Sequence, residues 1–260
     1  MKKRYTFESD EWFEADLEDL RRLLDENRQY LSNYEEVLSS LEDDDYVARG
    51  NGFCDRKYSD DFVEGQMEKY AGRIEKLEQW IAEWPLEALK AGNARFVKGE
   101  LTCDRDYAAD RERLSHGQRP FAVVLCCSDS RVSPEIVFDQ GLGDLFVIRN
   151  AGNVVDEDVL GSIEYAVEHL GTSLVVVMGH ANCGAVTAAC QNAELPGHIK
   201  TLAMRIRPAV SMDRLIDLSA RRHALRMAHE IADDAIVRHE KAQVVAAFYD
   251  IRSGVVEWLA

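Results

Sequence analysis

Two short apolar segments of the chain run directly into side chains that bind metals, and this pattern constrains the fold more than any other. Residues 121–125 (FAVVL) lead to Cys127, and residues 174–178 (LVVVM) lead to His180 and Cys183. A short continuous apolar run bounded by turn residues is typical of a strand buried on both faces of a parallel sheet. Because ligands of open α/β sheets collect at the carboxyl ends of such strands, we expect the three side chains to meet there.

The chemistry of these three side chains favours zinc. Two thiolates and one imidazole suit Zn²⁺, and three protein ligands leave a fourth position open, as in catalytic zinc sites. Cys126 should point to the other side of its strand, so we expect it to pack in the core. The six cysteines would suffice for three disulfides, but metal binding by a clustered subset is favoured in a chain without an export signal.

Further motifs surround the three ligand candidates in a fixed order. They are CSDSRV at 127–132, PE at 134–135, FDQG at 138–141, RNAGN at 149–153, GSIEY at 161–165 and HANCG at 180–184. Together they strongly resemble the β-class carbonic anhydrases. The resemblance covers roughly residues 86–260, which we expect to form the catalytic domain, and it does not extend to residues 1–85.

The order of the expected elements predicts an α/β fold. Apolar strands alternate with helical patterns, which predicts a mainly parallel sheet of about five strands flanked by helices. The strands are expected near 121–127, 145–149, 174–179, 242–250 and 255–259, and the helices near 134–139, 157–170, 184–192, 199–210 and 219–239. The resemblance adds an antiparallel edge strand at the C-terminus and a homodimer as the basic unit, with a tetramer or larger assembly left open.

The resemblance also implies the reaction. Members of the family use one zinc ion per chain to hydrate carbon dioxide reversibly to bicarbonate and a proton, through a zinc-bound hydroxide. Zinc lowers the pKa of a bound water to about 7. Asp129 and Arg131 match a pair in which the carboxylate stays ionised and accepts a hydrogen bond from that hydroxide. In a second state known in the family this carboxylate fills the fourth position on zinc, and the sequence leaves both states open.

Five further residues match substrate-binding positions of the family. Gln118 matches a glutamine that faces the substrate oxygens, and Gly184 matches a backbone position near the bound water. Phe146, Ala151 and Tyr165 match a small apolar pocket that is built partly from the partner subunit. Two alternative functions remain: hydrolysis of a CO2-like molecule such as carbonyl sulfide or carbon disulfide on the same site, or a catalytically silent zinc-stabilised scaffold.

Residues 1–85 predict a separate helical hairpin. Two series of residues recur at spacings of four and three: Phe13, Leu17, Leu20, Leu24, Asn27, Leu31, Tyr34, Leu38 and Leu41, then Val63, Met67, Tyr70, Ile74, Leu77, Ile81 and Trp84. Each series is a heptad seam on a helix. The turn signal at 49–52 links the helices, and Pro85 is expected to end the second helix and to mark the domain boundary. Leu23, Tyr30 and Val37 widen the apolar face of the first helix, so they should cover the catalytic domain or a second copy.

The charge of the chain excludes several partners. The formal net charge is −16, which argues against nucleic acid and anionic membranes. Residues 1–85 carry 12 basic and 23 acidic residues, a net of −11, so the hairpin is the more acidic part. The N-terminus lacks the apolar region of a signal peptide and no apolar run approaches ~20 residues, so we expect a cytoplasmic protein. Arg222 and His223 lie in an arginine-rich stretch that we interpret as a solvated helix face.

Overall fold

The computed structural model describes residues 17–42, 60–191 and 194–259. The chain divides into two compact units, Met1–Trp84 and Pro85–Ala260. One long helix contributes residues to both of them.

The N-terminal unit contains two antiparallel helices, α1 (Leu17–Glu42) and the first part of α2 (Asp60–Lys98). Their heptad seams meet in an apolar cluster of Leu20, Leu24, Leu77 and Trp80, against which Leu23, Ile74, Ile81 and Trp84 pack. Further along, the seam residue Tyr34 stacks on Tyr70 with ring centroids 5.7 Å apart. Leu23 and Tyr30, which were expected to cover the catalytic domain or a second copy, contact their own hairpin instead, Leu23 at the apolar cluster and Tyr30 on the Tyr70 ring. The predicted helices are therefore present and bury their seams against each other. Phe13 and the turn signal at 49–52 lie outside the described residues.

Pro85 lies inside α2, so the prediction that it ends this helix is wrong. Proline removes one backbone donor and strains the preceding turn, but packing on both sides outweighs this cost. Trp84 packs against the apolar cluster of the N-terminal unit, and Leu89 is fully buried within the second unit. Tertiary contacts thus override the local bias of the residue before proline.

The second unit is built on a five-stranded sheet with the order β2-β1-β3-β4-β5. Its strands are β1 (Ala122–Cys127), β2 (Leu145–Asn150), β3 (Leu174–His180), β4 (Gln243–Tyr249) and β5 (Val256–Leu259). The first four strands pair in parallel, and β5 pairs antiparallel with β4. The sequence therefore predicts the sheet and its antiparallel edge correctly. Strands β1 and β3 are buried along their whole length, as expected for central strands.

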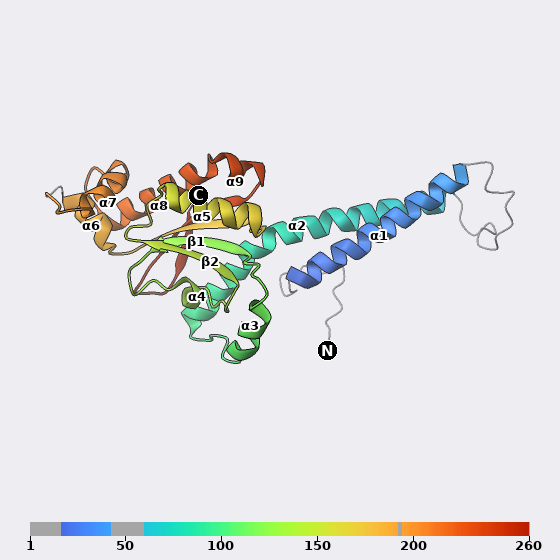
Figure 1. The fold of residues 1–260 in the computed structure, drawn as a ribbon, viewed down its shortest axis with the longest axis horizontal. Coiled ribbons are helices and arrows are strands. Elements are labelled where there is room, and N and C mark those ends of the chain that lie inside the picture. The colour runs from blue at the N-terminus through green and yellow to red at the C-terminus, as the bar shows by residue number, and fades with distance from the viewer. Residues whose placement is uncertain (1–16, 43–59, 192–193, 260) are drawn as a thin grey trace. The chain divides into compact units, whose positions relative to one another are not determined.

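Helices cover both faces of this sheet (Figure 1). They are α3 (Tyr107–Leu114), α4 (Pro134–Val137), α5 (Glu157–Glu164), α6 (Gly184–Gln191), α7 (Ile199–Ile206), α8 (Ile216–Ala232) and α9 (Ala235–His239). A π-helical turn, η3 (Tyr165–His169), extends α5, and a 3-10 turn, η4 (Arg207–Ala209), follows α7. Helices α5, α8 and α9 lie above the sheet in this view, with α4 and the end of α2 below it.

Two helix predictions differ from the structure. The single helix expected over 219–239 is divided into α8 and α9, because the Asp234 carboxylate caps a new helix by accepting hydrogen bonds from the backbone N–H groups of Ile236 and Val237. Helix α3 was not expected. It has no buried residue, so the apolar periodicity on which such predictions depend is missing.

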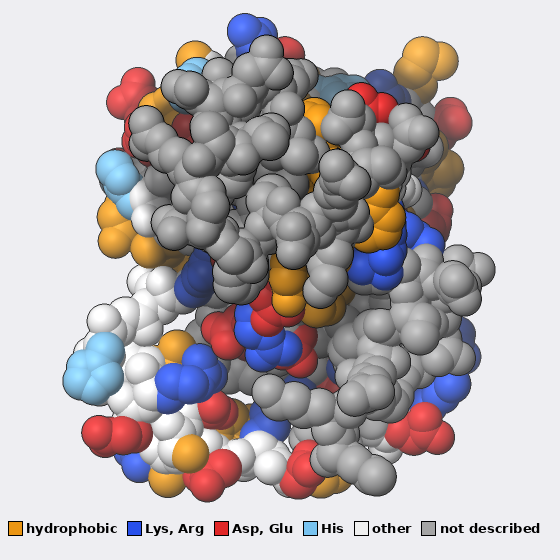
Figure 2. All heavy atoms as spheres, turned by 90° about the vertical axis from the view of Figure 1, so that its right-hand side faces the viewer, with side chains coloured by type: hydrophobic (Ala, Val, Ile, Leu, Met, Phe, Trp, Pro, Cys, Tyr) orange, Lys and Arg blue, Asp and Glu red, His pale blue; other side chains and the backbone are white. Residues whose placement is uncertain are grey.

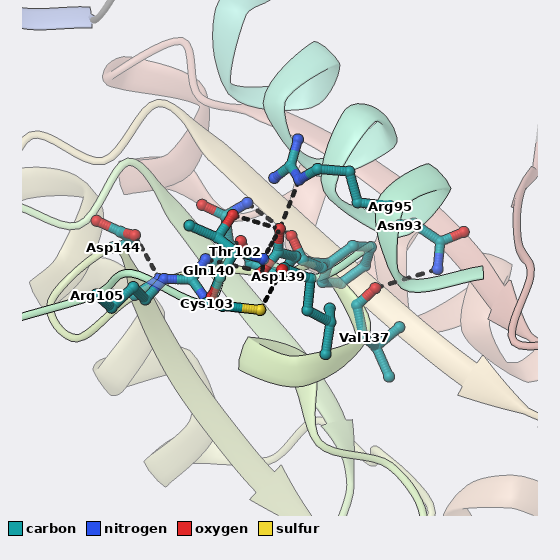
Figure 3. Close-up of polar contacts among 12 residues, drawn as sticks. Asn93, Arg95, Thr102, Cys103, Arg105, Val137, Asp139, Gln140 and Asp144 are labelled. Atoms are coloured by element: carbon teal, nitrogen blue, oxygen red, sulfur yellow. Dashed lines mark hydrogen bonds and ion pairs between the residues drawn. The ribbon is translucent and has the colours of Figure 1, made fainter. Parts of the chain in front are cut away.

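A buried carboxylate fixes the end of α2 to the rest of the second unit (Figure 3). Asp139 lies at the turn after α4 with a positive φ of 47°, and its side chain is fully buried. It forms ion pairs with Arg95 of α2 and with Arg105, and it accepts a hydrogen bond from the Thr102 hydroxyl at 2.9 Å. Two guanidinium groups and a hydroxyl satisfy the charge that burial would otherwise make costly.

One face of the described surface mixes both signs of charge. Figure 2 shows acidic and basic side chains interspersed over the described part of the face drawn there. Among the described residues, no helix is long and apolar enough to cross a bilayer.

Candidate zinc site

The three predicted ligands converge at the carboxyl ends of β1 and β3. Cys127 and His180 are the last residues of these two neighbouring strands, and Cys183 follows in the turn before α6. One donor atom from each residue lies within 4.8 Å of the other two. All three side chains are buried. The turn is held by Asn182, which adopts a positive φ of 52° and donates its backbone N–H to the Asp217 carboxylate at 2.9 Å.

The His180 ring is oriented for a metal. Its Nδ1 lies 3.0 Å from the carbonyl oxygen of Ala181, and because a carbonyl only accepts, Nδ1 carries the proton. The other nitrogen, Nε2, therefore presents a bare lone pair. It is buried and has no hydrogen-bond partner among the described residues. A carbonyl that fixes the tautomer while the second nitrogen points to a donor cluster is the usual arrangement of metal-binding histidines. The residues thus fit a metal ion.

The two cysteines are chemically unequal without a metal. The Cys183 thiol lies beside Cys127 and, together with the Gly152 N–H, holds the pKa of Cys127 well below its usual value. The proximity of that thiolate, together with burial, raises the pKa of Cys183. Metal binding requires both sulfurs as thiolates, so it is coupled to the release of thiol protons. Cys126 is fully buried and lies outside the donor cluster, and burial raises its pKa to about 12.

Asp129 and Arg131 form a bidentate ion pair beside the cluster. The Arg131 Nε donates to one carboxylate oxygen at 2.9 Å and its terminal nitrogen to the other at 2.7 Å. The backbone N–H of Arg131 adds a third bond at 3.0 Å. Arg131 thereby holds the pKa of Asp129 well below its usual range. Of the two states that the sequence leaves open, the structure has the paired one.

Arg149 fixes the loop that carries this ion pair. From the end of β2 its guanidinium donates to the carbonyl oxygens of Cys127 at 3.2 Å and Asp129 at 2.9 Å. The RNAGN motif contains this residue, but a bond to two backbone carbonyls leaves no trace in residue type or spacing. The sequence therefore marks the position without revealing its contacts.

The five predicted pocket residues are divided between the two ends of the sheet. Ala151 and Gly184 lie at the end that holds the ligands, directly after β2 and at the start of α6. Phe146 pairs with Val123 near the beginning of the strands. Val123 lies four positions before Cys127 along β1, a distance of about 13 Å.

The remaining two pocket residues also lie away from the ligand end of β1. Tyr165 is close to the Phe146 ring, with centroids 6.4 Å apart. Gln118 is exposed in the loop that precedes β1. Within one chain the structure does not bring Gln118, Phe146 and Tyr165 to the metal ligands.

His223 contradicts the interpretation of its helix segment as a solvated face. Its side chain is fully buried, and Nε2 lies 2.9 Å from the carbonyl oxygen of Gly152. The arginines around it in sequence point elsewhere because neighbouring residues lie on different sides of a helix. A single buried polar residue in such a stretch cannot be recognised from composition.

Comparison with known proteins identifies the family. The family model described as carbonic anhydrase matches residues 122–256. A carbonic anhydrase of Mycolicibacterium smegmatis is 49% identical over 143 residues, which cover 54% of this chain and 68% of that protein. A carbonic anhydrase of Pseudomonas aeruginosa is 38% identical over 179 residues, covering 61% and 72%.

A solved structure shares the fold. One of two tetrameric β-carbonic anhydrases from Sordaria macrospora aligns with a TM-score of 0.56 at 24% identity, over 59% of this chain and 87% of that one. The family model matches the segment that contains the four parallel strands and all three metal-ligand candidates. From the motifs, the fold and these relatives together, the chain belongs to the β-class carbonic anhydrase family.

Proposed function

We propose that the chain hydrates carbon dioxide reversibly to bicarbonate and a proton, at a zinc ion held by Cys127, His180 and Cys183. One observation carries the proposal: three buried donor atoms lie within 4.8 Å of one another, and the imidazole nitrogen among them has no partner among the described residues. Zinc bound there would act as a Lewis acid that lowers the pKa of a coordinated water.

Asp129 is proposed to orient the attacking water. Its carboxylate is ionised and mostly shielded from solvent, with 17% of the side chain exposed. A carboxylate in a bidentate pair still has lone pairs free to accept a further hydrogen bond. Arg131 positions Asp129 and keeps it from turning toward the metal. Arg149 holds the backbone carbonyls of Cys127 and Asp129, so the accepting carboxylate is fixed before substrate arrives.

A second copy of the chain is proposed to complete the substrate pocket. Gln118, Phe146 and Tyr165 lie at the end of the sheet away from the ligands of their own chain, and Tyr165 is 48% exposed. Strand β2 is at the edge of the sheet, so one of its sides is available to another molecule. We therefore propose a homodimer at least, in which each chain supplies these three residues to the site of the other. The Sordaria macrospora relatives are tetrameric.

The ligand set also bears on location. The cysteines that the structure describes are all unpaired: Cys103, Cys126, Cys127, Cys183 and Cys190. Cys127 and Cys183 must be reduced to bind zinc as thiolates. We propose a reducing compartment, the cytoplasm.

The proposal is tested by metal analysis and stopped-flow kinetics on one purified preparation. We expect about one zinc per chain and rapid acidification of a buffered indicator when CO2-saturated water is mixed in. The matched variants are Cys127→Ala, which removes a ligand, and Cys126→Ala, which removes the adjacent buried thiol. Only the first should lose zinc and activity.

The same preparation distinguishes the alternatives. Release of hydrogen sulfide from carbonyl sulfide without CO2 hydration would assign the site to a CO2-like substrate. Full zinc content with neither activity would leave a zinc-stabilised scaffold. Retention of zinc by the Cys127→Ala variant would remove the proposed ligand set.

A further inference from the structure

Gly152 links the metal site to the interior of the catalytic unit. Its backbone N–H donates to the sulfur of Cys127 at 3.3 Å, and its carbonyl oxygen lies 2.9 Å from Nε2 of His223 on α8. One bond uses the backbone N–H of Gly152 and the other uses its carbonyl. Helix α8 is therefore connected to the proposed ligand Cys127 through this single glycine.

The conformation of Gly152 needs this support. Its φ is +83°, and an added Cβ would lie 2.8 Å from Cδ1 of Ile206 and 2.9 Å from Cβ of Ala185. Only glycine fits, yet glycine has the softest backbone of all residues. The Asn150 side chain closes the loop by bonding both backbone groups of Val154, at 2.8 and 2.9 Å. His223 holds the middle of the loop.

The tautomer of His223 follows from its partner. Since the Gly152 carbonyl only accepts, Nε2 carries the proton, and Nδ1 is left as a buried acceptor with no partner among the described residues. Burial lowers the pKa of His223 to about 4, so the ring is neutral at working pH. An apolar side chain of similar size would avoid an unpaired buried nitrogen. The bond to Gly152 is what the imidazole provides in return.

A hydrogen bond donated to a metal-bound thiolate changes the Lewis acidity of the metal. A hydrogen bond draws negative charge from the sulfur, so the sulfur gives less charge to the metal, which stays a stronger Lewis acid. This matters most where two thiolates already neutralise a divalent ion. We propose that His223 is a positioning residue for the metal site: by holding the Gly152 carbonyl it keeps the Gly152 N–H on the Cys127 sulfur. The inference rests on the proposed metal site.

Cobalt(II) in place of zinc tests the proposal, because thiolate-to-cobalt charge-transfer bands report the charge on sulfur. The His223→Leu protein should show this band at longer wavelength than the unmodified protein, and its kcat for CO2 hydration should fall about tenfold. His223→Gln, which places an amide donor near the position of Nε2, should restore the band. His229→Leu changes an exposed histidine on the same helix and should leave it unchanged. A native band in His223→Leu, or no restoration by glutamine, would refute the proposal.

A measurement on the unmodified protein covers the case in which His223→Leu does not fold. With NMR-active cadmium bound and glycine and histidine labelled with nitrogen-15, the Gly152 amide proton should show scalar coupling to the metal through sulfur, and His223 should be protonated at Nε2. Absence of the coupling, or a proton on Nδ1, would contradict the inference. If the unmodified protein bound neither cobalt nor cadmium, the metal site itself would fail, and with it this inference.

Discussion

The two ends of the central sheet differ in how complete they are within one chain. At the carboxyl end, β1 and β3 bring Cys127, His180 and Cys183 together in a buried cluster. At the amino end, Phe146 and Tyr165 lie close to each other but remain partly or largely exposed. A single chain thus builds its metal ligands but only half of the expected substrate pocket.

The difference follows from the physics of each end. Parallel strands align their carboxyl ends by backbone hydrogen bonding alone, so ligands placed there meet without help from another molecule. Strand β2 has no neighbouring strand on its open side. The apolar side chains near its amino end can therefore be buried further only against a second surface. The ligand end should therefore respond to changes within one chain, and the pocket end to changes in assembly.

Loss of any ligand should have the largest effect. Cys127→Ala, His180→Ala and Cys183→Ala each leave two donors in a site with three, so we expect the metal to be lost and CO2 hydration to fall to the uncatalysed rate. Metal analysis and stopped-flow assays check both. Retention of full metal content by any of the three proteins would show that the ligand end is built differently.

Asp129→Ala should lower turnover while the metal stays bound. Groups that orient or move protons contribute about 10²- to 10⁴-fold, and we expect a loss of kcat in that range. Because Arg131 depresses the pKa of Asp129, the carboxylate remains charged down to acidic pH. The pH profile of the unmodified protein should accordingly show no step from Asp129 above about pH 5. Near-normal turnover in Asp129→Ala would assign the orienting role to another group.

Gln118→Ala tests whether the pocket end works across a subunit boundary. Loss of a substrate-facing donor should reduce kcat about 10²-fold. Mixed dimers of Gln118→Ala and Cys127→Ala chains contain one site with both an intact ligand set and an intact glutamine. Co-expression should therefore restore about a quarter of native activity if the chains pair at random. Activity no higher than that of the separate variants would place the glutamine in the same chain as its metal.

Removal of the N-terminal unit should have the smallest effect on the ligand end. A chain that begins at Pro85 starts α2 with the residue type preferred at the first helical position, and all three ligands lie beyond it. We expect it to retain zinc and to change in solubility or oligomeric state, because removing the unit would expose any apolar surface that Leu23, Tyr30 and Val37 cover, and such a patch promotes association. Sedimentation and metal analysis of both chains check this. A shortened chain without zinc would show that the proposed boundary divides the catalytic fold.

The sequence predicted the metal ligands better than the residues that hold them in place. Apolar runs that stop at Cys127 and His180 place these residues at strand ends, and the sheet follows from the alternation of elements. The burial of His223 was not predicted, because it depends on which side of α8 faces the sheet. The prediction for Pro85 was wrong because a local backbone bias is weaker than the packing of Trp84 and the burial of Leu89 on either side of it. Both errors concern energies that arise only after distant segments pack.

The hydrogen bonds of Asn93 affect how the catalytic unit folds during synthesis. Its side chain donates to the carbonyl oxygens of Val137 and Gly254 and accepts the backbone N–H of Val256, at 3.1, 2.9 and 2.9 Å. Two of these bonds join segments more than 160 residues apart in sequence. On a ribosome, residue 93 emerges long before residues 254 and 256, so β5 cannot dock until synthesis has passed them. Contacts of such long range slow folding, and β4 remains an edge strand of the nascent sheet until β5 pairs with it.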